Sequence, residues 1–303
     1  MQIPEELKQA IEPFFENIST HSLRRAREAL SKDYQEGATS PFEDEGKRLA
    51  YLGARMPATF AAVHQVLQKL SLKGHLLDLG AGPGTASWAG LTLFPELEKI
   101  TLLEKNPEAI ALGKKLAQAH PILRNATWIQ ENLDRAIPEA DSAILSYVVG
   151  ELEDYTKVIE HCWRAVSTLI IVEPGTPKAF ERMKKIREQL IALKAYIIAP
   201  CPHLFHCPNP WCHFSTRVER SRLHRLLKGG SLGFEDEKFC YLIASKSPSA
   251  PFSARVIRQP LKCTGHVRLS LCTKEGMLVE KTISKKEKNS YRLARNSEWG
   301  SQM

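Results

Sequence analysis

The stretch LLDLGAGPGT, residues 76–85, constrains the fold of this chain more than any other segment. Its apolar start predicts a strand that ends at Asp78, and a helix is expected to begin near Thr85. Glycine is needed between them because the backbone must turn tightly and approach a ligand with no Cβ in the way. Three glycines supply this freedom, Gly80, Gly82 and Gly84.

Further short apolar runs, separated by helix-like stretches, follow this turn. They are ITLLEKNP, AILSYVV and TLIIVEPG, and then AYIIAP (195–200) and KFCYLIASK (238–246). Such alternation is typical of a parallel sheet with helices on both faces. The sequence therefore predicts an α/β fold of the Rossmann-like kind.

The sequence as a whole suggests three domains. Residues 1–73 hold two helical patterns and are expected to form an N-terminal helical cap. Residues 74–247 carry the sheet, with a cysteine-rich insertion at 200–230 that includes a basic helix. Residues 248–303 show the alternation of short strands, with a KEG turn, and are expected to form a small antiparallel β appendage.

Composition is that of an ordinary globular protein, with 43% hydrophobic and 25% charged residues. No apolar run approaches the ~20 residues of a membrane span, so we expect a soluble protein. The acidic N-terminus lacks the features of a signal or transit peptide. That pattern favours a bacterial cytoplasm, or a processed chain.

Charge is distributed unevenly along the chain. Residues 1–177 hold 18 basic and 24 acidic side chains, whereas residues 178–303 hold 24 basic and 10 acidic ones. Clustered Lys and Arg release counterions from phosphate backbones, so the second half is a candidate RNA-binding region. A solvated basic surface is the alternative. The RNA-binding candidates, taken as one helix, are Arg217, Arg220, Arg222, Arg225 and Lys228.

The glycine loop differs from the dinucleotide-binding fingerprint, since Thr85 stands where that motif has its third glycine. An acid before G-x-G-x-G suits a cationic cofactor, and the loop resembles that of Rossmann-type S-adenosylmethionine methyltransferases. The resemblance implies that the loop, from Asp78, cradles the methionine part of the cofactor. It also implies that Glu104 holds the ribose hydroxyls, and Asn132 is the candidate beside the adenine. A remnant fold with an empty pocket is the alternative.

Catalytic residues are not evident. Amino-methylating enzymes usually carry D/N-P-P-Y/F after the fourth strand, where this chain has SYVVGEL from Ser146. Methylation of a pyrimidine carbon needs a thiolate on such a strand, and none is there. Glu151 and Glu173 are available acids, but each has an equally good structural role, so the catalytic residues stay unknown.

The segment CPHLFHCPNPWCHF, residues 201–214, gathers three cysteines and three histidines. A chain without a secretory signal is not expected to use them for disulfides. Three close thiols can bind one metal centre with a fourth ligand from elsewhere. Zinc would accept a histidine of the loop, whereas an iron–sulfur cluster prefers a fourth thiolate. The candidate fourth thiolates are Cys240, Cys263 and Cys272, and free thiols remain the alternative.

Taken together, the motifs resemble one family, the methyltransferase-like proteins of the small ribosomal subunit. They include AYLGARMPATFAAV, LLDLGAGPGTASWA, VEPGTP, the cysteine segment with STRVERSRLHRLLKG, GHVRLSLCTKEG and a closing EWG. The resemblance implies a four-iron, four-sulfur cluster, with zinc as the alternative. The ligands that it implies are Cys201, Cys207, Cys212 and Cys272.

Two functions follow from this resemblance. The first is an S-adenosylmethionine-dependent methyltransferase-like protein that acts on or binds small-subunit ribosomal RNA in ribosome biogenesis. The alternative is a non-catalytic iron–sulfur assembly factor that binds the same RNA. Either would work with the small ribosomal subunit, without a membrane or a disulfide-linked partner. Its location would be the bacterial cytoplasm, or the mitochondrial matrix in a eukaryote.

Overall fold

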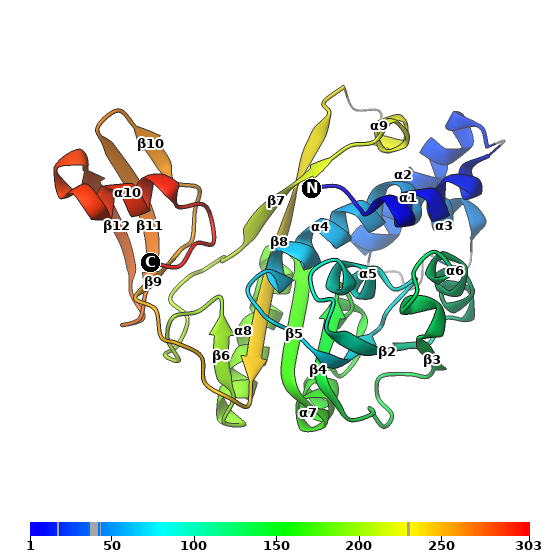
Figure 1. Ribbon diagram of the computed structural model, residues 1–303, viewed down its shortest axis with the longest axis horizontal. Helices are drawn as coiled ribbons and strands as arrows, with labels where there is room; N and C mark the ends of the chain where they lie inside the picture. Colours follow the sequence, from blue (N-terminus) through cyan, green and yellow to red (C-terminus); the bar gives the residue numbers. More distant parts are fainter. Residues whose placement is uncertain (17, 37–41, 43, 229–230) are drawn as a thin grey trace. The chain divides into compact units, whose positions relative to one another are not determined.

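The computed structural model describes residues 1–16, 18–36, 42, 44–228 and 231–303 (Figure 1). The chain divides into two compact units. Unit 1 comprises Met1–Val166 and Thr216–Glu237, and unit 2 comprises Ser167–Ser215 and Lys238–Met303. The three domains expected from the sequence, with boundaries at residues 73 and 247, stay a proposal.

Helices form the N-terminal part of unit 1, as the apolar spacing predicts. Asp44 caps one of them, because its side chain accepts the Lys47 N–H over 2.8 Å. Pro57 stands in the first turn of the last helix, where a missing N–H costs nothing, and a π-helical turn precedes it. The elements are α1 (Glu5–Ile11), α2 (Thr20–Glu36), α3 (Glu45–Ala50), the π turn (Tyr51–Arg55) and α4 (Met56–Leu67).

Four parallel strands form the sheet of unit 1, in the order β3-β2-β1-β4. Leu76, Leu77 and Leu79 of β1 are fully buried, as expected of a strand covered on both faces. The fold class predicted from the sequence, α/β with a mainly parallel sheet, is confirmed. The elements are β1 (Gly74–Leu79), α5 (Thr85–Leu91), β2 (Leu97–Glu104), α6 (Pro107–Ala117), β3 (Thr127–Gln130), β4 (Ala140–Ser146) and α7 (Tyr155–Ala165).

Parallel strands bring their carboxyl ends to one edge of a sheet, where α/β proteins bind their ligands. In unit 1 the glycine loop follows β1 at this edge, and Glu104 ends β2. Asn132 lies two residues past the end of β3. Three segments named from the sequence are therefore neighbours in space.

Unit 2 has antiparallel strands, with β8 (Phe234–Ser245) pairing on either side with β5 (Val166–Pro174) and β6 (Tyr196–Ala199). Helix α8 (Pro177–Ala192) is capped by Thr176, which accepts the Ala179 N–H over 3.2 Å. The cysteine segment follows β6, as predicted.

The single basic helix expected over residues 217–228 is wrong in its first half. Residues Phe214–Glu219 form strand β7, which pairs with β8, and helix α9 spans only Arg222–Lys228. Two features explain the strand. Thr216 and Val218 are β-branched, and the buried Val218 stands between the exposed Arg217 and Glu219. Arg217 is therefore a strand residue.

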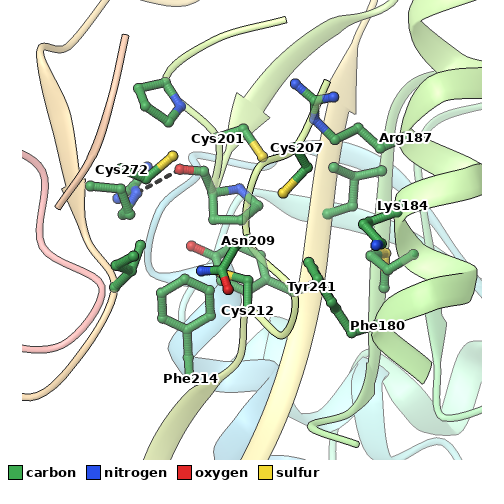
Figure 2. Close-up of a pocket in the computed structure, with 16 residues that line it drawn as sticks. Phe180, Lys184, Arg187, Cys201, Cys207, Asn209, Cys212, Phe214, Tyr241 and Cys272 are labelled. Atoms are coloured by element: carbon green, nitrogen blue, oxygen red, sulfur yellow. Dashed lines mark hydrogen bonds between the residues drawn. The ribbon is translucent and has the colours of Figure 1, made fainter. Parts of the chain in front are cut away.

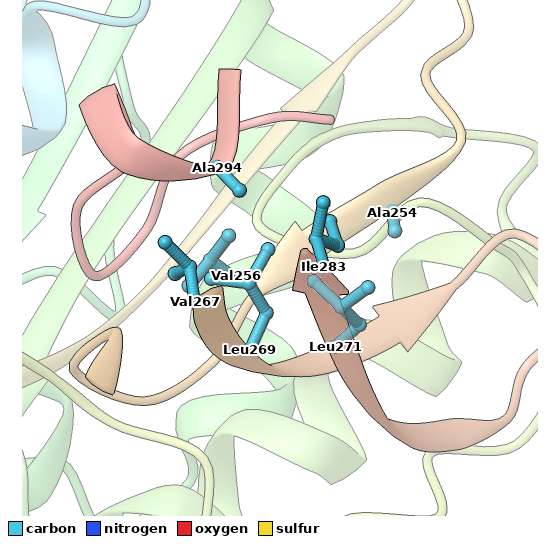
Figure 3. Close-up of a cluster of buried hydrophobic side chains, with 7 residues drawn as sticks. All are labelled: Ala254, Val256, Val267, Leu269, Leu271, Ile283 and Ala294. Carbon is cyan, nitrogen blue, oxygen red and sulfur yellow. The ribbon is translucent and has the colours of Figure 1, made fainter. Parts of the chain in front are cut away.

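A four-stranded antiparallel sheet lies near the C-terminus. Its buried side packs against helix α10 (Lys288–Asn296) through seven apolar residues (Figure 3). The strands are β9 (Ala254–Val256), β10 (Leu261–Cys263), β11 (His266–Thr273) and β12 (Leu278–Ser284). The seven residues are Ala254, Val256, Val267, Leu269, Leu271, Ile283 and Ala294.

Candidate functional site

The glycine loop of unit 1 adopts a backbone that only glycine adopts without strain. Gly80, Gly82 and Gly84 have φ angles of 66°, 53° and 85°. A Cβ on Gly80 would stand 2.4 Å from the Val148 side chain, whereas one on Gly82 would meet nothing closer than 3.7 Å. Gly80 and Gly82 thus have different roles. Gly80 permits close packing, and Gly82 leaves space beside the backbone.

Glu104 bonds the glycine loop directly. Its Oε2 accepts the Gly82 N–H over 2.8 Å, and its Oε1 accepts the Asn106 N–H over 2.9 Å. The side chain is nearly buried, at 8% exposure. Each carboxylate oxygen has a second lone pair, so Glu104 can still accept hydroxyl donors such as those of a ribose. Asn132 is exposed at the same edge of the sheet.

Asp78 is fully buried rather than facing solvent. Its Oδ2 accepts both the N–H and the hydroxyl of Ser87, over 2.9 and 2.8 Å, and so fixes the first turn of α5. Its Oδ1 has no hydrogen-bond partner among the described residues. Burial raises the pKa of Asp78 to about 7, although the bonds from Ser87 lower it.

Tyr51 joins the helical part of unit 1 to the glycine loop, a contact that the sequence did not reveal. Its hydroxyl lies 3.1 Å from the Thr85 Oγ1, and burial raises its pKa to about 12. The ring also packs edge-on against Phe42, 5.0 Å between centroids. The motif AYLGAR contains this tyrosine, but nothing in its spacing indicates that it meets a loop 34 residues away.

The segment after β4 holds a strained residue. Tyr147 has a φ of 58°, which is rare for a side-chain-bearing residue, and such strain often marks a functional position. Its hydroxyl donates to Glu237 over 2.9 Å, and the Arg55 guanidinium lies 4.5 Å above its ring. Arg55 also pairs with Glu237 over 3.0 Å.

The two acids considered from the sequence lie in different settings. Glu173 is buried, at 2% exposure, and its Oε2 lies 3.5 Å from Arg182. Glu151 is exposed. Neither setting indicates a catalytic role, and the catalytic residues stay unassigned.

In unit 2, four cysteines line one cavity of about 40 Å³, walled also by α8 and β8 (Figure 2). All seven cysteines of the chain are free thiols. Cys240 instead donates to the Pro174 carbonyl over 3.4 Å, and Cys263 lies on β10. Of the three candidates for a fourth thiol, the structure brings Cys272 to the cavity. The four are Cys201, Cys207, Cys212 and Cys272.

The thiols are close enough to influence one another. Burial, together with the charges of Cys201 and Cys207, raises the pKa of Cys272 to about 12. Burial and the same neighbours hold the pKa of Cys212 well above its usual range. The charges of Arg187 and Arg255 act in the opposite direction on Cys272 and favour its thiolate.

Two buried arginines line the same cavity, each at 3% exposure or less. Arg187 donates from Nη2 to the His203 carbonyl over 2.6 Å, and Arg255 donates from Nη1 to the Gly300 carbonyl over 2.8 Å. The Nε of Arg187 and the Nη2 of Arg255 have no acceptor among the described residues. Two buried cations with unused donors require negative charge nearby.

The three histidines of the cysteine segment have separate surroundings. The Nε2 of His203 lies 3.4 Å from the Cys272 sulfur, whereas His206 is exposed and pairs with Glu188. His213 stacks on Trp211 with 4.1 Å between centroids. Across the described part of the chain, no three ligand-type side chains lie close enough to hold a single metal ion.

Acidic residues neutralise part of the basic segment of unit 1, which is residues 217–228 of β7 and α9. Arg217 pairs with Asp236 over 3.0 Å. Arg220 and Lys228 both pair with Glu235, over 2.7 and 2.6 Å. Three of the five predicted RNA-binding cations are therefore already in ion pairs.

Glu235 is the centre of that network. The buried His224 also reaches it, over 3.2 Å. Burial raises the pKa of Glu235, but the bonds from His224, Lys228 and Arg220 outweigh it and hold that pKa well below its usual range. Arg222 and Arg225 are exposed on α9, and no acidic partner for either is found among the described residues.

A model of the family described as mitochondrial small ribosomal subunit Rsm22 matches residues 45–303 of this chain. The Rsm22-cox11 tandem protein 2, mitochondrial, of Schizosaccharomyces pombe is 26% identical over 89% of this chain and 46% of its own length. The human ribosome assembly protein METTL17, mitochondrial, is 25% identical over 84% of this chain and 62% of its own length. The chain thus spans between about half and three fifths of these relatives.

Among solved structures, a SAM dependent methyltransferase from Aquifex aeolicus aligns with 14% identity and a TM-score of 0.45. The alignment covers 68% of this chain and 98% of that one.

Proposed function

This chain belongs to the Rsm22 family of the mitochondrial small ribosomal subunit, and from that premise we propose that it is an S-adenosylmethionine-dependent methyltransferase-like protein of ribosome biogenesis. It acts on or binds small-subunit ribosomal RNA. The Schizosaccharomyces pombe and human relatives are named as mitochondrial proteins, and the matrix is the proposed location in a eukaryote. Among the described residues, no helix is long and apolar enough to span a membrane.

The observation that carries the cofactor proposal is the bond between Glu104 and the Gly82 N–H. It holds the loop backbone and a carboxylate together at the carboxyl edge of the sheet, where the loop would cradle methionine and Glu104 would accept ribose hydroxyls. The unpartnered Oδ1 of Asp78 leaves one buried acceptor beneath the same loop. When bound, the cofactor supplies an electrophilic methyl group.

Calorimetric titration with S-adenosylmethionine tests this site. We expect wild-type protein to bind and Gly82→Arg not to bind, because an arginine at a φ of 53° is strained and fills the space beside the loop. Gly265→Arg is the matched control, since Gly265 also has a positive φ but stands in open space. Equal binding by wild type and Gly82→Arg would contradict the site.

Transfer of a labelled methyl group to precursor small-subunit RNA tests turnover. Wild-type transfer that is lost in Gly82→Arg supports an enzyme. Cofactor and RNA binding without any transfer would leave the non-catalytic assembly factor as the function.

For the cavity, we propose a four-iron, four-sulfur cluster held by Cys201, Cys207, Cys212 and Cys272. Supporting it is the arrangement of four thiols around a space of about 40 Å³, which would hold roughly three water-sized spheres at ~10–15 Å³ each. A single zinc ion, the alternative, would need all four sulfurs at ~2.3 Å from one point. The four thiolates that ligate the cluster would supply negative charge for the unused donors of Arg187 and Arg255.

Elemental analysis of anaerobically purified protein tests the cluster. We expect about four irons per chain and a brown colour, with iron lost in Cys207→Ser. Cys263→Ser is the control, because that cysteine does not line the cavity. Colourless protein with stoichiometric zinc would overturn the cluster in favour of zinc, and metal-free wild type would leave free thiols.

A further inference from the structure

We propose that the C-terminal helix and the turn before it form a surface that binds the phosphates of RNA. This inference rests on the proposed function, and it locates the RNA contact on residues outside the basic segment of unit 1. The five cations of this α10 surface are Lys285, Lys286, Lys288, Arg292 and Arg295.

The charge of the α10 surface is not neutralised. All five side chains are exposed, and the described residues provide no acidic partner for any of them. Glu287 is the one acid between residues 285 and 296, and its carboxylate accepts the Ser284 N–H over 2.7 Å at the start of the turn. This differs from the segment around Arg220, where Glu235 and Asp236 neutralise three cations.

Helical spacing places the cations together. Arg292 and Arg295 are three residues apart and so share one face of α10, and Lys288, whose φ is 32°, is the first residue of that helix. Ala294 points the other way, into the apolar core of the small sheet (Figure 3). The helix therefore presents charge on one side and is anchored by the other.

This arrangement favours RNA as the occupant. A membrane-binding helix needs an open apolar face, and the apolar face of α10 is already covered by the sheet. Leu293 is exposed, but one leucine does not make such a face. Closely spaced cations on a fixed helix match the regular spacing of backbone phosphates.

The α10 surface is also tied to the cysteine cavity. Arg255, which lines the cavity, donates to the carbonyls of both Pro200 and Gly300. Trp299 packs edge-on against His213, 5.1 Å between centroids. The chain that follows α10 is thus fixed to the cysteine segment, which keeps the helix in place.

The test measures binding of a fluorescent small-subunit RNA fragment by the metal-loaded full chain across a range of salt. The variant changes three cations to glutamine, Lys288→Gln, Arg292→Gln and Arg295→Gln. We expect about a 10- to 100-fold loss of affinity and a salt slope lower by about 2, given ~0.7 per phosphate contact on single strands. The matched control changes three exposed cations of unit 1, Lys114→Gln, Lys115→Gln and Arg124→Gln.

Three outcomes are distinguishable. Loss of affinity in the α10 variant but not in the control supports the surface, provided that both proteins keep their helical circular dichroism. Unchanged affinity in the α10 variant, or an equal loss in both variants, overturns this inference while RNA binding stands. Absence of binding by the wild type overturns the RNA part of the proposed function itself.

Discussion

The Nε of Arg255 donates a hydrogen bond to the carbonyl oxygen of Pro200 over 2.7 Å. The bond links strand β9 to the residue just before Cys201, although the two are 55 positions apart in the chain. A guanidinium at 2% exposure is costly to bury, and it is tolerated where its donors and its charge are satisfied. The backbone satisfies two of its donors, and the proposed cluster would balance the charge.

Substitution of a cavity arginine should therefore change the cluster's electrochemistry. In Arg187→Lys we expect the cluster to remain and its midpoint potential to fall by about 60 mV, the equivalent of a tenfold change for one electron. A lysine carries the charge but lacks the planar set of donors, so the hydrogen bonds that Arg187 would donate to the proposed cluster would be lost. Protein-film voltammetry measures this shift.

Arg182→Lys is the control for that measurement, because Arg182 pairs with Glu173 and does not line the cavity. An Arg187→Lys potential equal to that of the wild type, with iron still bound, would show that the guanidinium does not reach the centre.

Asp78→Asn should remove a pH dependence of stability. The native pKa of about 7 is above the unfolded value near 4, so the native state binds more protons between those values. The stability linked to Asp78 is complete below pH 4 and is lost as the pH rises to 7, by up to about 1.4 kcal/mol per pH unit. Urea unfolding from pH 4 to 8 should show a flatter profile for the variant.

Asp141→Asn serves as the comparison for Asp78, since it changes an exposed aspartate on the neighbouring strand β4. Parallel pH profiles for wild type and Asp78→Asn would mean that Asp78 does not titrate in this range.

Glu235→Gln should lower the free energy of unfolding by about 1–2 kcal/mol at pH 7, because it leaves the cations Arg220 and Lys228 without their carboxylate. The native pKa is depressed, so this contribution is present above the unfolded value near 4.3 and is lost as the pH falls below it. Wild type and variant should therefore converge in acid. Chemical unfolding at pH 7 and pH 3 measures the difference.

Asp236→Asn offers a paired measurement, since its partner Arg217 is exposed and the expected loss of stability is much smaller than that for Glu235→Gln. Equal costs for the two substitutions at pH 7 would refute the central role of Glu235.

The basic segment of unit 1 should contribute to RNA binding through Arg222 and Arg225, which have no acidic partner among the described residues. We expect Arg222→Gln with Arg225→Gln to reduce RNA affinity several-fold and to lower the salt slope by about 1. Arg217→Gln should have little effect, because Asp236 already neutralises that side chain. Fluorescence anisotropy measures both affinities. A larger loss in Arg217→Gln than in the double variant would show that the ion pair of Arg217 opens on binding.

Local pattern was enough to predict the strand, turn and helix around Gly82, because apolar periodicity and glycine placement act over a few residues. It failed at Arg217, where a run of basic residues suggested one helix. Exposed and buried side chains in fact alternate there, with Val218 buried between two exposed residues, as in a strand. Strand β10 has only three residues, two of them exposed, so it carries no readable alternation. Short elements depend on their partners, which the sequence does not display.

The candidate sites show the same division. Spacing brought out Cys201, Cys207 and Cys212 as a group, but only family resemblance chose Cys272 among the distant cysteines. The pairing of Glu235 with Arg220 and the contact of Tyr51 with Thr85 were not predicted. Both depend on how remote segments meet, which is decided by packing of the whole unit.

The contact between His203 and Cys272 closes a loop of 69 positions, with a distance of 3.4 Å between Nε2 and sulfur. A nascent chain whose strand β11 is still inside the ribosomal tunnel cannot complete the wall of the cavity. Filling of that cavity must then follow the synthesis of β11, and the cavity of a polypeptide cut short before that strand could never be filled. The cavity therefore registers whether synthesis has passed Cys272.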